Sequence, residues 1–63
     1  MHAKFEEALT LAKTLAREYN KIMVVFKHHE DVEVVCQDTY VALFEIHGLE
    51  CLAKVAPSGR IIQ

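Results

Sequence analysis

Two short apolar runs around a polar tetrad constrain this chain more than any other feature. The runs, Ile22–His28 and Val32–Gln37, are rich in Val, Ile and Phe, residue types that favour β-strands. They flank the polar sequence His28-His29-Glu30-Asp31. In a chain of only 63 residues there is room for one domain, spanning 1–63, and the runs predict an antiparallel hairpin within it.

Side-chain alternation predicts how the two strands pair. The expected core face holds the even-numbered apolar residues of both runs: Ile22, Val24, Phe26, Val32, Val34 and Cys36. Directly opposed residues share a face, so we expect a three-residue loop, His29-Glu30-Asp31, with Asp31 left-handed and Phe26 opposite Val34. The other face then carries Met23, Val25 and Val35, which is too apolar for a solvated surface.

A helix is expected on each side of the hairpin in the sequence. Ala3–Tyr19 has apolar residues at steps of three and four, and Asn20 tolerates the left-handed conformation that ends helices. A second helix is predicted from Asp38 or Thr39 to Ile46 or His47, closed by Gly48. This second helix is apolar nearly all round, which is typical of a helix buried on several sides.

The C-terminal third predicts two more strands. Leu49–Ala56 alternates, and Pro57-Ser58-Gly59 is suited to a tight turn that places Ile61 opposite Val55 in a final strand, Arg60–Gln63. The predicted fold class is therefore α+β, a small single domain of order α-β-β-α-β-β. We expect a mainly antiparallel sheet packed by two helices.

The apolar content exceeds what so short a chain readily buries. It is 52% hydrophobic, and a domain of this size hides only about 60% of the surface that its unfolded chain exposes. We therefore predict a non-catalytic interaction module, a homodimer or the partner of another protein, which regulates or inhibits a larger protein. The expected interface comprises Met23, Val25, Val35, Tyr40, Leu43 and Phe44.

Charge and targeting signals narrow the alternatives. The net charge of −2 gives no general attraction to nucleic acid, yet Lys13, Arg17 and Lys21 form a basic edge that supports a second hypothesis, a nucleic-acid-binding accessory domain. The longest apolar run, Ile22–Phe26, is too short to span a membrane, and no signal peptide is visible. We expect a cytoplasmic protein with no membrane association and reduced cysteines.

No metal, cofactor or catalytic site is predicted. The chain has residues able to bind metals, namely His28, His29, Glu30, Asp31, Cys36, His47 and Cys51, but it lacks the paired spacing of structural zinc sites. Ser58 fits a turn, and the two glycines are isolated, so neither a nucleophilic site nor a phosphate loop is indicated. A small-ligand pocket between subunits stays open as a third hypothesis, without a motif that supports it.

The order of elements resembles one known family, the N-terminal domain of MutS mismatch-repair proteins and related small phage and plasmid units. Phe26-Lys27, Glu33 and Asp38 lie at spacings similar to the family's Phe-Arg-x-Gly-Asp-Phe-Tyr-Glu and Asp-Ala, and the similarity spans about residues 5 to 52. His29 replaces the family's Gly, and Asp31-Val32-Glu33 replaces its Phe-x-Glu. The resemblance therefore implies a similar fold, but not the residues that read a mismatched base.

Overall fold

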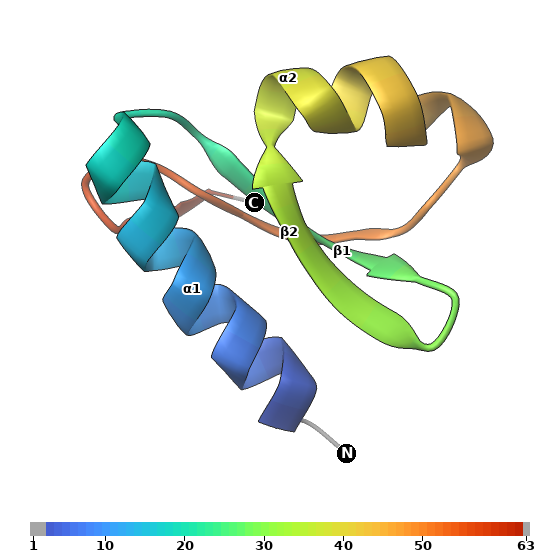
Figure 1. The fold of residues 1–63 in the computed structure, drawn as a ribbon, viewed down its shortest axis with the longest axis horizontal. Coiled ribbons are helices and arrows are strands. Elements are labelled where there is room, and N and C mark those ends of the chain that lie inside the picture. Colours follow the sequence, from blue (N-terminus) through green and yellow to red (C-terminus); the bar gives the residue numbers. More distant parts are fainter. Residues whose placement is uncertain (1–2, 63) are drawn as a thin grey trace.

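A four-stranded antiparallel sheet with the strand order β2-β1-β3-β4 forms the centre of the molecule (Figure 1). This computed structural model describes residues 3–62. The elements are α1 (Ala3–Tyr19), β1 (Met23–His28), β2 (Asp31–Cys36), α2 (Gln37–Thr39), the π-helical turn η1 (Tyr40–Phe44), the 3-10 turn η2 (Glu45–His47), β3 (Cys51–Val55) and β4 (Ile61–Ile62). We call α2, η1 and η2 together the second helical segment. The predicted α+β class and the order α-β-β-α-β-β are confirmed.

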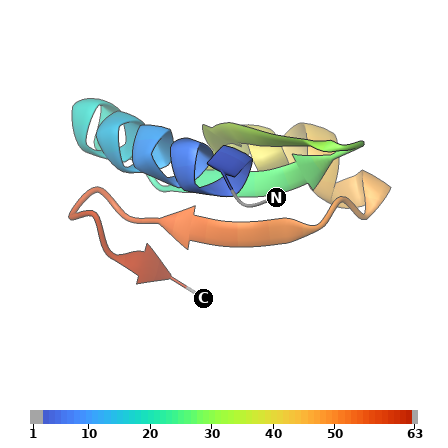
Figure 2. The same ribbon diagram turned by 90° about the horizontal axis from the view of Figure 1, so that it is seen from below.

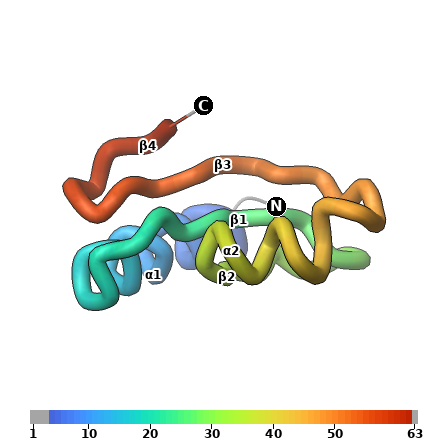
Figure 3. The backbone as a smooth tube through the Cα atoms, turned by 90° about the horizontal axis from the view of Figure 1, so that it is seen from above, coloured from blue at the N-terminus to red at the C-terminus, as the bar shows by residue number. Residues whose placement is uncertain are grey.

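The two helical parts cover opposite faces of the sheet. Figure 1 looks onto the β2 edge, with α1 on one side of that strand and the second helical segment on the other. Figure 2 shows the strands following one another away from β2, and the tube in Figure 3 shows β4 at the far edge. The sheet is therefore the middle layer of three.

Each face of the sheet has its own apolar cluster. On the α1 side, alanines of the helix pack on alternate residues of β1 and β3; this cluster comprises Ala8, Ala12, Ala16, Met23, Val25, Ala53 and Val55. On the other side, Val24 and Phe26 pack against Tyr40, with Val35, Phe44 and Leu49 at the margin. Small residues at steps of four along α1 let the helix approach the sheet closely. As predicted, the helix ends at Tyr19, and Asn20 is left-handed with a φ of 54°.

The hairpin differs from the prediction in its register. His28 pairs with Asp31 and Phe26 with Glu33, so the loop has two residues, His29-Glu30, instead of three. The left-handed residue is His29, with a φ of 59°, and not Asp31. The prediction was wrong because it placed the even-numbered residues of both strands on one face, whereas Val25 pairs with Val34 and Phe26 with Glu33. Since both faces are covered, β1 is apolar at both parities, and parity alone does not fix the register.

This register corrects the expectation of an uncovered sheet face. Met23 and Val25 lie beneath α1, where they are 5% and 0% exposed. Val35 lies on the opposite face, packed against the cluster of Phe26 and Tyr40. The surface that was expected to need a partner is covered within one chain.

The remaining elements follow the prediction in outline. The second helical segment starts at Gln37 without a side-chain cap, so neither Asp38 nor Thr39 caps it, but it closes at Gly48, whose φ is 70°. In β3 the register against β1 shifts between Val25 and Phe26. Ile61 pairs with Val55 as expected.

Candidate protein-interaction surface

The second helical segment exposes large apolar side chains on its outer side. Val41 is 49% exposed, Leu43 57% and Ile46 80%. We call these three residues the outer apolar surface. Exposed single apolar residues are common, but three within six positions make this segment a candidate for contact with another molecule.

Aromatic packing on the inner side fixes the orientation of this segment. The rings of Tyr40 and Phe44 lie 5.4 and 4.8 Å from the ring of the fully buried Phe26, measured between centroids. The Tyr40 hydroxyl donates a 2.7 Å hydrogen bond to the carbonyl of Leu49, and burial raises the pKa of this phenol. Because these rings are held against the sheet, the intervening residues Val41 and Leu43 face away from it.

The predicted interface residues therefore divide into three groups. Met23, Val25 and Tyr40 are buried within the chain, so the structure corrects their assignment to a contact surface. Val35 and Phe44 are half-buried and support the inner cluster. Leu43 alone lies on the outer apolar surface.

Val41 and Ile46 were missed as candidates. Their signal was present in the sequence, because a helix that is apolar all round must expose some apolar residues when it covers only one sheet face. Which side of the second helical segment packs on the sheet depends on the hairpin register, and the sequence pattern does not determine that register.

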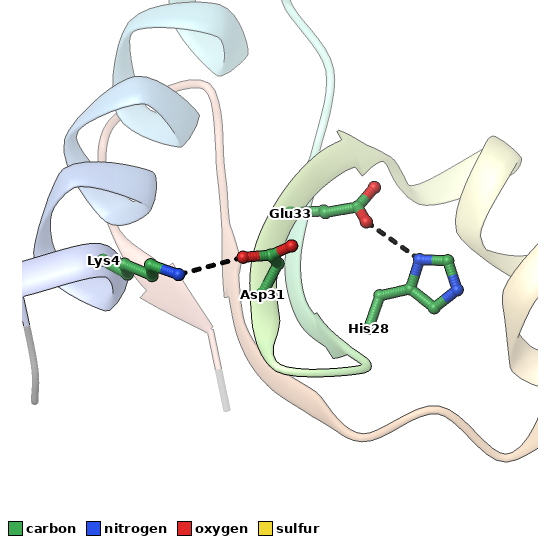
Figure 4. A network of polar contacts seen from close by, with 4 residues as sticks. All are labelled: Lys4, His28, Asp31 and Glu33. Carbon is green, nitrogen blue, oxygen red and sulfur yellow. Dashed lines mark hydrogen bonds and ion pairs between the residues drawn. The ribbon is translucent and has the colours of Figure 1, made fainter.

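Two residues of the polar tetrad, Asp31 and His28, make side-chain contacts with residues outside it (Figure 4). Lys4 Nζ lies 3.0 Å from Asp31 Oδ1, and His28 Nδ1 lies 2.8 Å from Glu33 Oε2. The hydrogen bond from Lys4 and its positive charge hold the pKa of Asp31 below its usual value. Within residues 3–62, no three His, Cys, Asp or Glu side chains gather in a way that could hold a metal ion.

The two cysteines are free and lie in different environments. Cys36 is half-buried, with its sulfur 3.1 Å from Thr39 Oγ1, whereas Cys51 is exposed. The hydrogen bond of the Thr39 hydroxyl lowers the pKa of the Cys36 thiol, and the Thr39 backbone N–H adds to the effect. A hydroxyl stabilises a thiolate but is no general base, so this contact makes no nucleophilic site by itself.

The predicted basic edge is divided between two places. Lys13 and Arg17 line a shallow hollow of about 250 Å³ with Thr10, Thr14 and the turn at 57–59. Lys21 lines a separate hollow, in which Asp38 provides an opposing charge. Lys13 and Arg17 therefore share one hollow, and Lys21 lines another.

Comparisons with known proteins add no relative to this arrangement. In the described part of the chain, no helix has both the length and the hydropathy required to cross a membrane. The resemblance to the N-terminal domain of MutS proteins stays a prediction. No family model matches the chain, and no match was found among curated proteins or solved structures.

Proposed function

We propose that this chain is a non-catalytic interaction module that associates with a second copy of itself through the outer apolar surface. The observation that carries the proposal is the exposure of Val41, Leu43 and Ile46, at 49%, 57% and 80%. Each of these side chains gains apolar contact when another molecule covers it, at about 25 cal/mol per Å² removed from water.

The thin core beneath the second helical segment gives association a structural reason. The fully or nearly buried residues on that side of the sheet are Val24, Phe26 and Tyr40. A domain this small commonly needs a disulfide, a metal or a partner subunit for stability, and its cysteines are free. A partner packed on the outer apolar surface would bury the side chains that the second helical segment now exposes, and would so enlarge the apolar core.

A second copy suits the surface because its rim is self-complementary. Glu45 and His47 alternate with the apolar residues on the same segment, and both are exposed. In a contact with two-fold symmetry, the Glu45 of each chain can lie opposite the His47 of the partner, which avoids placing the two glutamates against each other. A stable dimer needs about 800 Å² from each partner. That is nearly a fifth of the chain's 4503 Å², so the contact would extend onto neighbouring exposed residues.

Regulation of a larger protein is the role proposed for such a module. A two-fold dimer presents the same surface twice, which strengthens binding to a partner with repeated sites through effective concentration. Nucleic-acid binding through Lys13, Arg17 and Lys21 stays the alternative. It predicts that the affinity for nucleic acid falls steeply as the salt concentration rises, and that Arg17→Glu lowers this affinity further.

Leu43→Glu tests the proposal, because it places a charge in the centre of the surface without touching the core. The matched control is Leu11→Glu, at a leucine of α1 that is 50% exposed against 57% for Leu43. Multi-angle light scattering should give twice the chain mass of 7.2 kDa for the native protein and the control, and 7.2 kDa for Leu43→Glu. A native monomer, or a Leu43→Glu dimer, would refute the proposal.

A further inference from the structure

The free edge of β2 carries unpaired backbone groups that point away from the sheet. Gln37 N–H bonds to Ile22 O at 2.9 Å, and Lys27 N–H bonds to Glu50 O at 2.9 Å on the opposite side of β1. With the register of the hairpin, these bonds show that odd-numbered residues of β2 face β1. The N–H and C=O groups of Val32 and Val34 therefore point outward, where the sheet order places no further strand.

A hollow beside this edge is lined by apolar side chains. It measures about 630 Å³ and lies between α1 and β2, with Ala8, Leu11, Val32 and Val34 along it. Leu11 is 50% exposed and Val32 and Val34 are partly exposed. An added strand would extend the sheet through its backbone and place every second side chain in this hollow.

The charges around the hollow specify the chemistry of that strand. One lysine, Lys4, stands against three carboxylates, Glu7, Asp31 and Glu33, which gives a net charge of −2. Lys4 is already paired with Asp31 at 3.0 Å. Asp31 and Glu33 alternate with Val32 and Val34 along β2; the Asp31 carboxylate reaches Lys4 of α1, and the Glu33 carboxylate contacts His28 (Figure 4).

We infer that the β2 edge binds an extended segment of a partner protein in which apolar and basic residues alternate. The apolar side chains lie against Val32 and Val34 in the hollow beside α1, and the basic side chains at the alternate positions lie next to Asp31 and Glu33. A second copy of β2 is a poorer occupant, because it would bring another Asp31 and Glu33 against the first pair. This edge is separate from the outer apolar surface, so the inference does not depend on the proposed dimer.

The probe is acetyl-Lys-Val-Lys-Val-Lys-Val-amide, whose alternation suits either strand direction, and the control peptide has Glu in place of each Lys. Titration of ¹⁵N-labelled protein should show binding about tenfold tighter or more for the lysine peptide. The largest shifts and slowed hydrogen exchange should occur at the amides of Val32 and Val34. Methylation of the peptide's backbone nitrogens should abolish the effect.

Two charge reversals locate the site. Glu33→Lys should reduce the preference for the lysine peptide by about fivefold or more, whereas the same change at the exposed Glu18, near the other end of α1 and outside the hollow, should leave it within about twofold. Val34→Pro should also weaken binding, since it removes an outward N–H without breaking a bond to β1. Equal binding of both peptides, shifts confined to another surface, or edge amides already protected by a second copy would overturn the inference.

Discussion

Replacing Phe26 by Leu tests whether β1 presents its even-numbered residues to the second helical segment. Phe26 is fully buried, and two aromatic rings lie within 5.4 Å of its centroid. Each such ring pair contributes about 0.5–1.5 kcal/mol beyond its buried area, so Phe26→Leu should cost about 1–3 kcal/mol. A chain of 63 residues has a total stability of about 3–9 kcal/mol, so most of the variant should still fold.

A double-mutant cycle with Phe44→Leu isolates the contact. The two rings are 4.8 Å apart, so the cycle should give a coupling free energy of about 0.5–1.5 kcal/mol. The control is Phe5→Leu, because Phe5 packs against the cluster on the opposite face. Its effect should add to that of Phe26→Leu within about 0.3–0.5 kcal/mol.

Urea unfolding followed by circular dichroism measures all six proteins, the native chain, the three single variants and the two double variants, at one concentration. With a slope near 1 kcal/mol per M for so small a domain, Phe26→Leu should lower the midpoint by about 1–3 M. If the alternative three-residue loop were correct, Phe26 would lie on the α1 face beside Val34. Coupling to Phe5 together with additivity toward Phe44 would refute the register described here.

Three further predictions concern the turn, the thiol and the ion pair. His29→Gly should stabilise the fold by about 0.5–1 kcal/mol in urea unfolding, since relief of a left-handed histidine, with a φ of 59°, outweighs the added freedom of the unfolded chain. Glu30→Gly, at a position without a positive φ, should destabilise it instead. Thr39→Val should raise the pKa of Cys36, because it removes the hydroxyl bonded to the sulfur, and the alkylation rate of that thiol should then rise only at higher pH. Lys4→Met should raise the pKa of Asp31 toward its ordinary value of 3.8, as carboxyl ¹³C NMR would show. Because Lys4 lowers the pKa of Asp31 in the folded state, the ion pair stabilises the fold above pH 3.8. This stabilisation is lost as the pH falls through the lowered pKa of Asp31. If the acid titration of Asp31 were the same in Lys4→Met as in the native protein, the prediction would be contradicted.

The elements could be predicted from the sequence because local signals determine them. The three- and four-residue spacing of α1, the left-handed Asn20, the Gly48 helix end and the turn ending at Gly59 each depend on a few neighbouring residues. The pairing of Ile61 with Val55 followed from the length of that turn. These local signals do not depend on the tertiary packing.

The register and the contact surface could not be predicted because they depend on what covers each face. A β-strand that is apolar at every position, as in Met23–Phe26, fits a two-residue and a three-residue loop equally well. The packing of α1 and of the second helical segment on the two faces of the sheet determines which loop length forms. With the register shifted by one residue, Val25 lies beneath α1, whereas Leu43 and Ile46 are among the large apolar residues that stay exposed.

We propose that the exposed apolar residues of the second helical segment bind a second copy of the chain. Isotope-filtered NMR on a mixture of labelled and unlabelled chains tests it most directly. We predict intermolecular contacts from the methyl groups of Val41, Leu43 and Ile46, and none from Met23 or Val25. A mixture without intermolecular contacts, or contacts centred on Val25, would contradict the account.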